Sequence, residues 1–245
     1  MATKPVAIAH EAIHETVQEI LDGEERGRVL DVPAGEGALA MRLKEIGFDV
    51  ACCDLYPEIF QLEGTEIRSG DLDGRLPYED NEFDKVVCVE GLEHIENPAN
   101  AIREFSRLIK PGGRLIVSVP NIMNIEERFK WLLNGYTSHF KPLSQEKLAA
   151  VRAERPGMEE IALHVNPIGY GEVRFLLEKN GFAIEQLYRD KPKANSWAFR
   201  PFVGLIRLVS RLTPEKKRAT VWASELNSDE VLLGGNTLIF KAKKL

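Results

Sequence analysis

Two closely spaced glycines and a later aspartate form the pattern in this sequence that is best suited to chemistry. Gly35 and Gly37 follow a short apolar run, and Asp54 ends the next apolar run, 17 positions beyond Gly37. Glycines let a ligand approach the backbone closely, and the start of the following helix presents unpaired N–H groups. A carboxylate at the end of the second strand can accept hydrogen bonds from both hydroxyls of a ribose. The pattern therefore predicts a ligand that contains a nucleoside.

The same turn also satisfies the G-x-G-x-x-G/A pattern of dinucleotide-binding proteins over residues 35–40. Two further carboxylates favour a different nucleoside. Asp31 lies inside the first strand, where a dinucleotide-binding fold normally has apolar residues before its first glycine. Asp71 follows the third strand, where it can accept a hydrogen bond from the exocyclic amine of an adenine.

Alternating strands and helices must hold these residues in place. Apolar runs bounded by turn residues predict seven strands, at residues 28–33, 48–54, 66–69, 83–89, 114–119, 182–188 and 236–242. Helical spacing and caps predict helices at residues 6–21, 36–46, 98–109 and 168–180. This alternation is typical of a doubly wound, parallel α/β sheet. The last two strands are separated by a long segment, which suits an antiparallel pair at the edge of the sheet.

Residues 28–120 resemble the core of the class I S-adenosylmethionine-dependent methyltransferases. The resemblance covers about half of the chain and is carried by five elements in order: Leu30-Asp31-Val-Pro-Ala-Gly35-Glu-Gly37, Asp54, Gly70-Asp71, Phe83-Asp84 to Val89-Glu90, and Leu108-Ile-Lys-Pro-Gly-Gly113. It implies a mostly parallel, seven-stranded Rossmann-like sheet whose last strand is antiparallel. It also implies S-adenosylmethionine as the methyl donor and S-adenosylhomocysteine as the product.

The resemblance assigns most of the cofactor site to the first two strand ends. Gly35 and Gly37 would let the backbone pass under the methionyl and ribose parts of the cofactor. Asp31 would orient that loop and reach the amino group of the ligand. Asp54 would hold the ribose hydroxyls, and Leu55 follows it as a further cofactor-binding residue.

Three residues further along the chain complete the cofactor site that the resemblance implies. Asp71 would bind the adenine amine, Leu72 would pack on the adenine ring, and Glu90 would face the methionyl end. Pro33-Ala34 stands where the family usually has Gly-Cys or Gly-Ser. Proline removes one N–H donor, so we expect a slightly different ligand geometry at this turn.

The segment Glu90-Gly-Leu-Glu93-His94 resembles the Glu-x-x-Glu-His segment of ubiquinone-pathway O-methyltransferases and of small-RNA ribose methyltransferases, where those side chains can hold a divalent cation. Together with His139 or His164, the segment could bind Mg²⁺ or a borderline metal, which would lower the pKa of a bound hydroxyl. In the simpler interpretation these side chains line the substrate pocket. We expect no metal and assign His94 as the general base, with His164 as the alternative.

Composition limits the domain organisation and the partners. The 245 residues fit one domain, with a lid helix at 1–22, a cofactor-binding core at 28–120, and substrate or lid segments at 121–165 and 190–234. The net charge of −6 argues against a nonspecific nucleic-acid partner. Three cysteines in apolar runs indicate reduced thiols and a cytoplasmic protein. Neither a transmembrane run nor a secretory signal is expected.

Residues 197–212 form a strongly amphipathic segment with apolar side chains over one broad helical face and three arginines on the other. The pattern indicates a lid helix or a dimer helix that docks on the domain. An interfacial helix that brings the enzyme to a lipid surface is the alternative. Peripheral membrane contact and a homodimer both remain open.

The expected reaction moves a methyl group to a small-molecule, lipid or glycan acceptor, at a hydroxyl oxygen. The apolar and aromatic content of residues 120–165 and 190–234 slightly favours an amphipathic acceptor. Two other functions are compatible with the glycine turn. One is an NAD(P)-dependent oxidoreductase, and the other is a noncatalytic, methyltransferase-like binding protein.

Overall fold

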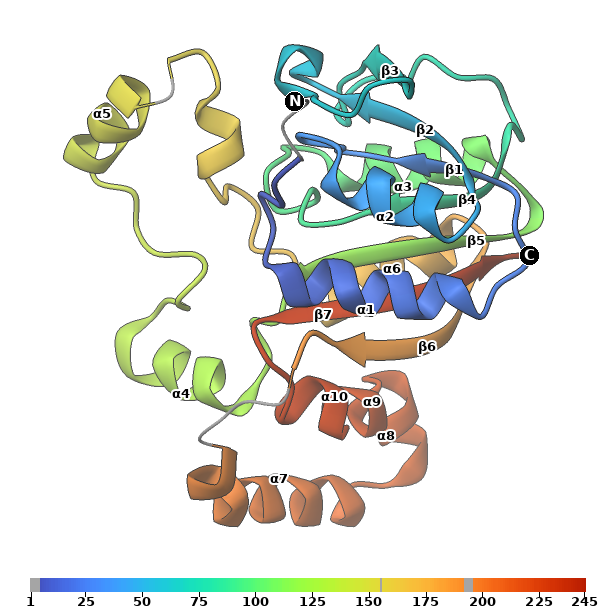
Figure 1. Cartoon of the computed structure of the whole chain (residues 1–245). Helices are drawn as coiled ribbons and strands as arrows, with labels where there is room; N and C mark the ends of the chain where they lie inside the picture. The colour runs from blue at the N-terminus through green and yellow to red at the C-terminus, as the bar shows by residue number, and fades with distance from the viewer. Residues whose placement is uncertain (1–4, 155, 192–195) are drawn as a thin grey trace.

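The computed structural model describes residues 5–154, 156–191 and 196–245, and places one twisted sheet at its centre (Figure 1). The strands described are β1 (Arg28–Asp31), β2 (Asp49–Asp54), β3 (Glu66–Ser69), β4 (Phe83–Cys88), β5 (Ile109–Pro120), β6 (Phe182–Arg189) and β7 (Thr237–Lys244). They lie in the order β3-β2-β1-β4-β5-β7-β6, and β7 runs antiparallel to both of its neighbours. The expected seven-stranded sheet with an antiparallel last strand is confirmed.

Helices cover both faces of this sheet, as the near-continuous apolar runs of its strands require. The main helices are α1 (Glu11–Asp22), α2 (Ala38–Glu45), α3 (Pro98–Leu108), α4 (Ile125–Asn134), α5 (Gln145–Glu154), α6 (Tyr170–Lys179) and α7 (Arg200–Leu212). Short helical turns are η1 (Pro57–Ile59), η2 (Glu159–Ala162), η3 (Ser196–Phe199), α8 (Glu215–Thr220), α9 (Ala223–Leu226) and α10 (Asp229–Leu232).

Alternate residues of each strand divide the core between two layers. Val29 of β1 packs with α1 and α2, whereas its neighbour Leu30 packs with α3 and α6 on the opposite face. Each layer is a cluster of fully buried side chains, such as Val17 and Leu43 on one side and Phe105 and Leu177 on the other. The two layers fix the strand ends, and with them the loops that follow.

Two predicted elements differ from the structure. The first helix begins at Glu11 instead of residue 6, because His10 has extended backbone angles and the residues before it lie along a cavity. The strand predicted at residues 114–119 begins earlier, at Ile109, and residues 110–113 form a bulge between the pairing of Ile109 with Phe83 and the resumed pairing at Arg114. Gly113 permits this close pairing, since a Cβ there would lie 2.6 Å from the Asp84 carbonyl oxygen.

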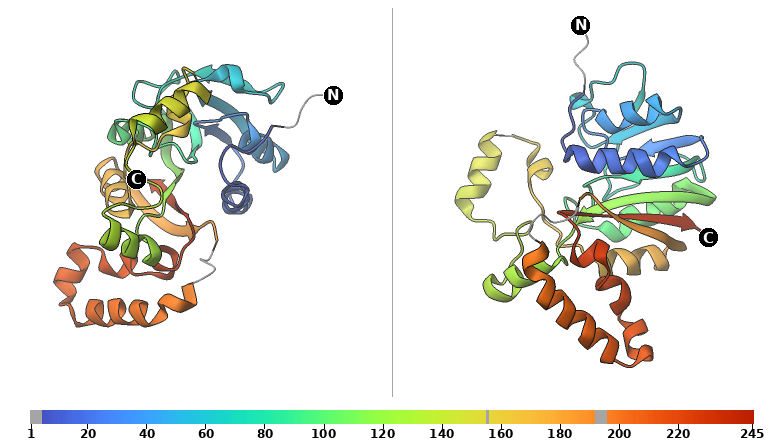
Figure 2. Two further views of the ribbon diagram at one scale, coloured as in Figure 1. Left: turned by 90° about the vertical axis from the view of Figure 1, so that its left-hand side faces the viewer. Right: turned by 60° about the horizontal axis from the view of Figure 1, so that its bottom comes forward.

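Two long segments extend from the sheet (Figures 1 and 2). Residues 121–165, which carry α4, α5 and η2, follow β5 and reach across the carboxyl ends of the parallel strands. Helices α7 to α10 lie between β6 and β7 in the chain and pack beyond the β6 side of the sheet. The lid and substrate segments predicted at 1–22, 121–165 and 190–234 include residues 1–4, 155 and 192–195, which lie outside the described residues. No helix within the described part is long and apolar enough to cross a membrane.

Candidate active site

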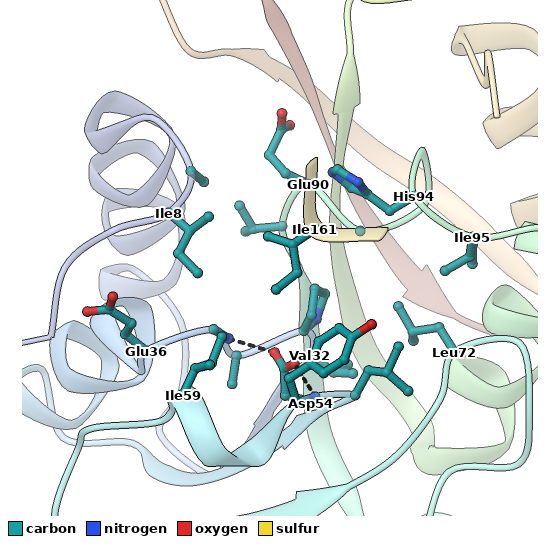
Figure 3. A pocket seen from close by; sticks show the side chains of 18 of the residues that line it. Ile8, Val32, Glu36, Asp54, Ile59, Leu72, Glu90, His94, Ile95 and Ile161 are labelled. Carbon is teal, nitrogen blue, oxygen red and sulfur yellow. Dashed lines mark hydrogen bonds between the residues drawn. The ribbon is translucent and has the colours of Figure 1, made fainter. Parts of the chain in front are cut away.

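A cavity of about 760 Å³ lies at the carboxyl ends of β1, β2 and β4, where doubly wound sheets bind their ligands (Figure 3). Its floor consists of the loops that follow these strands. Its cover comes from the segment before α1 and from residues 148–165. Of the described residues in 196–234, none lines it. The structure therefore brings only the first two of the three predicted covering segments to this cavity.

Asp54 joins the glycine turn to the end of β2. Its Oδ2 accepts a hydrogen bond from the Gly35 N–H at 2.8 Å, and its Oδ1 accepts one from the Tyr56 N–H at 2.9 Å (Figure 3). Gly35 has a φ of +53°, a conformation that favours glycine. Both Gly35 and Asp54 line the cavity. A carboxylate oxygen accepts more than one hydrogen bond, so Asp54 can hold the turn and a ligand hydroxyl together.

Gly37 has a packing role that the sequence pattern did not indicate. It precedes α2 with a φ of +95°, and a Cβ there would lie 2.8 Å from the Phe60 ring. Gly37 is not among the described residues that line the cavity. The structure thus requires glycine at this position for the start of the helix and the approach of Phe60, and the predicted contact with the cofactor stays a prediction.

Asp31 is a carboxyl group in an apolar setting. It is 1% exposed, it lines the cavity, and its Oδ2 has no hydrogen-bond partner among the described residues. Burial, together with the negative charge of Asp54, raises the pKa of Asp31 to about 8. An unsatisfied buried carboxyl group is costly unless a ligand completes it. A cationic group, such as the amino group of a methionyl moiety, fits this position.

The loop after β3 forms the far wall of the cavity. Asp71 Oδ1 accepts a hydrogen bond from the Asp73 N–H at 2.8 Å, and Asp73 in turn accepts one from the Asn97 N–H at 2.6 Å. Leu72 beside them is buried, whereas Leu55, at the end of the neighbouring strand, is 42% exposed. Asp71, Leu72 and Leu55 all line the cavity, where an adenine ring would find apolar surface beside an acceptor.

Glu90 lies at the opposite end of the cavity from Asp54 (Figure 3). Its backbone has a φ of +50°, and its carboxylate accepts a hydrogen bond from the Ser118 hydroxyl at 3.0 Å. Burial raises the pKa of Glu90. A non-glycine residue in this conformation requires support from its surroundings, here from the Ser118 side chain on β5.

His94 lies beside Glu90 and has a defined tautomer. Its Nδ1 is 3.0 Å from the Leu163 carbonyl oxygen, which can only accept a hydrogen bond, so we assign the proton of the neutral ring to Nδ1. Nε2 then carries the lone pair that a general base needs. The ring meets His164 edge to face, with the centroids 4.7 Å apart, and His164 also stacks on His139 at 6.3 Å. Burial lowers the pKa of His164 to about 4, so this imidazole stays neutral.

Glu93 is fully buried behind these rings, and neither of its carboxyl oxygens has a hydrogen-bond partner among the described residues. Burial, together with the charge of Glu90, raises the pKa of Glu93 well above its usual range. Ligand atoms of Glu93, His94 and His164 all lie within 4.8 Å of one another. One carboxylate and two imidazoles suit a borderline divalent cation, which would favour the ionised form of Glu93.

Several lining residues were absent from the predicted site. Ile8 and His14 come from the N-terminal segment, and Arg152, Ile161 and Leu163 come from the segment after β5. Their positions depend on long-range contacts. The Glu93 carbonyl, for example, accepts hydrogen bonds from the backbone N–H groups of residues 165 and 166. No local spacing in the sequence signals such a contact.

Comparison with known proteins shows which family this chain resembles. A family model described as a methyltransferase domain matches residues 7–187, which is most of the chain. Ubiquinone biosynthesis O-methyltransferases of Xanthomonas oryzae pv. oryzae and Xylella fastidiosa are 37% and 38% identical over 103 residues. That region covers 38% of this chain in both cases, and 43% and 42% of the two relatives. The chain therefore matches less than half of the length of these curated relatives.

Solved structures share the fold over nearly the whole chain. An S-adenosylmethionine-dependent methyltransferase from Mesorhizobium loti aligns with a TM-score of 0.56 at 18% identity, covering 97% of this chain and 100% of its own. A second such enzyme, from Archaeoglobus fulgidus, aligns with a TM-score of 0.53 at 17% identity and covers 94% of each chain. These similarities confirm the predicted fold. Because the family model matches most of the chain, the chain belongs to the methyltransferase domain family, in the S-adenosylmethionine-dependent class that its sequence predicts.

Proposed function

We propose that this protein transfers the methyl group of S-adenosylmethionine to a hydroxyl oxygen of a small, partly apolar acceptor. One observation carries the proposal: a continuous cavity has the glycine turn and Asp54 at one end and the imidazole of His94 at the other. The curated relatives are named O-methyltransferases, which supports a hydroxyl acceptor. Because the matched region is partial, those names do not identify the acceptor of this chain.

The end of the cavity at the glycine turn and Asp54 is the donor end, and its residues bind and orient S-adenosylmethionine. S-adenosylmethionine supplies, when bound, a methyl group already activated on a sulfonium. Asp54 accepts hydrogen bonds from the ribose hydroxyls, and Asp71 accepts one from the adenine amine. Asp31, once ionised, pairs with the cationic methionyl end. Such alignment of the reacting groups can supply about 7–11 kcal/mol of the barrier reduction.

The residues at the acceptor end handle the proton. Bound S-adenosylmethionine would supply the methyl group to the acceptor oxygen, and its sulfur would keep the electron pair of the broken carbon–sulfur bond. Nε2 of His94 accepts the proton that the hydroxyl loses. The hydrogen bond from Nδ1 to the Leu163 carbonyl fixes the ring for this step. Apolar side chains between the two ends, among them Ile8 and Ile161, keep water away from the reacting atoms (Figure 3).

The family assignment argues against the oxidoreductase alternative, since the matching model and folds are those of methyltransferases. A noncatalytic binding protein would keep the donor end and lose the acceptor chemistry. A metal-assisted reaction would use Glu93, His94 and His164 together. A methyl-transfer assay distinguishes both alternatives from the proposed base mechanism.

The test is a methyl-transfer screen with labelled S-adenosylmethionine against cell-extract fractions separated by polarity. We expect label in a moderately apolar fraction, and it should persist in the presence of a chelator. Loss of transfer with chelator would replace the base mechanism by a metal mechanism. Tight binding of S-adenosylhomocysteine without transfer to any fraction would favour the noncatalytic alternative.

A further inference from the structure

Helix α7 presents its apolar side to solvent. Val203 is buried and Ile206 is half-buried against the body of the protein, where they pack with residues of α4 and α10. Five larger apolar side chains are between 47% and 75% exposed: Phe202, Leu205, Leu208, Val209 and Leu212. At 100° per residue they fall within one arc of about 120°. A helix that served only the core of this domain would turn such an arc inward.

The last turn of α4 extends this apolar surface. Phe129 of α4 contacts Phe202 of α7, with the ring centroids 4.9 Å apart, so the two helices lie side by side at this point (Figures 1 and 2). Trp131, Leu132 and Leu133 at the end of α4 are each more than half exposed. Leu132 and Leu133 follow Phe129 by about one helical turn and lie on its side of α4, whereas Trp131 lies on the opposite side. We call Leu132, Leu133 and the five residues of α7 the α4–α7 surface.

The charge of α7 and α8 differs from that of the whole chain. Residues 200–220 contain six basic residues and one acidic residue, although the chain as a whole has a net charge of −6. Arg200 and Arg211 are exposed on the arc next to the apolar one, and Lys216 and Lys217 are exposed on α8. A second copy of the chain, docked by a twofold axis, would bring these positive charges together. An anionic partner instead complements them.

We propose that the α4–α7 surface docks on an anionic lipid bilayer, with α7 lying in the plane of the headgroups. The combination of a broad apolar arc and flanking arginines is typical of helices that bind at such an interface. The contact is peripheral, because α7 has 13 residues and its bounds leave it too short to span a bilayer. This inference does not depend on methyl transfer, since no described residue of α7 lines the cavity.

The test is co-sedimentation of the full-length chain with vesicles of phosphatidylcholine alone and of phosphatidylcholine mixed with phosphatidylglycerol. We expect binding to the mixed vesicles only. The variant with Leu205→Ser and Leu208→Ser should bind about tenfold more weakly or worse, because each substitution removes apolar area from the bilayer contact. Phe175→Ser is the matched control, since Phe175 is 54% exposed on α6, away from this surface.

Charge is tested separately with Arg200→Gln and Arg211→Gln. Each should weaken binding to the mixed vesicles about fivefold. Equal binding to both vesicle types, or an equal loss in Phe175→Ser, would overturn the proposal. So would absence of vesicle binding together with a concentration-dependent dimer that Leu205→Ser and Leu208→Ser abolish. Binding of S-adenosylhomocysteine should be unchanged in every variant, which shows that the fold is intact and separates this outcome from that of the proposed reaction.

Discussion

The two ends of the cavity are built in different ways. At the donor end, Asp31, Gly35 and Asp54 sit on strand ends that the sheet itself fixes, and a hydrogen bond from a backbone N–H to a carboxylate locks the turn. At the acceptor end, His94 and Glu93 depend on a segment about 70 residues later in the chain, through the Leu163 carbonyl and the backbone N–H groups of residues 165 and 166. In the proposed reaction, the sheet itself would thus hold the methyl donor, and a segment added to the sheet would hold the acceptor.

The largest effect on methyl transfer is expected from a substitution of His94 at the acceptor end. His94→Asn keeps an N–H donor toward the Leu163 carbonyl and removes the base. Methyl transfer should fall about 100- to 10,000-fold, the usual range for loss of a general base. Calorimetry with S-adenosylhomocysteine should give an unchanged affinity. A parallel loss of cofactor affinity would show that the two ends are not independent.

Asp54→Ala alters the donor end alone. The variant loses the hydrogen bonds to the ribose and the link to Gly35, so S-adenosylhomocysteine should bind about 100-fold more weakly, as expected for two charge-assisted hydrogen bonds. Isothermal titration measures this change. Unchanged affinity would place the ribose elsewhere in the cavity.

Asp31 makes cofactor affinity depend on pH. Its pKa of about 8 means that it is mostly neutral at pH 7, and a cationic ligand stabilises its ionised form. Affinity for S-adenosylmethionine should therefore rise about tenfold between pH 7 and pH 9, because the ionised fraction rises by that factor. Asp31→Asn should remove this dependence, and the difference between the two proteins cancels the titration of the ligand itself. An identical pH profile in both would contradict the assignment.

Glu93→Gln probes the acceptor end through the stability of the fold and leaves the donor end unchanged. The folded-state pKa of Glu93 is raised, so the free energy of unfolding is highest below the unfolded pKa of about 4.5 and falls as the pH rises toward the folded pKa. The amide side chain of the variant does not ionise, so its free energy of unfolding does not fall in this way as the pH rises. The variant should gain about 1–3 kcal/mol at pH 7 in urea unfolding, and no more than a small difference should remain at pH 4. A variant less stable than the wild type at pH 7 would mean that a cation holds Glu93 ionised.

The same contrast explains what the sequence could and could not predict. The sheet, its antiparallel β7, and the positions of Asp31, Gly35, Asp54 and Asp71 at one edge follow from local periodicity and from the rule that parallel strand ends meet at one edge. The resemblance around Glu90 to His94 named His139 or His164 as a later partner, and the structure brings His164 to Glu93 and His94. Local periodicity could not choose between the two histidines, because 70 residues separate His164 from His94.

Two local features were also beyond sequence reasoning. Asp54 was expected to bind the ribose alone, yet it also anchors the glycine turn, a contact that depends on the tertiary pairing of β1 with β2. Gly37 was expected to face the cofactor, but the approach of Phe60 already accounts for the glycine there. In both cases a residue pattern indicated the right element, and packing determined what each residue does.

Titration of the full-length chain with S-adenosylhomocysteine tests the central claim most directly, with NAD as the matched nucleoside ligand. A donor end held by the fold predicts saturable binding of one S-adenosylhomocysteine per chain and no heat with NAD. No detectable binding of S-adenosylhomocysteine at millimolar concentration, or preferential binding of NAD, would contradict it.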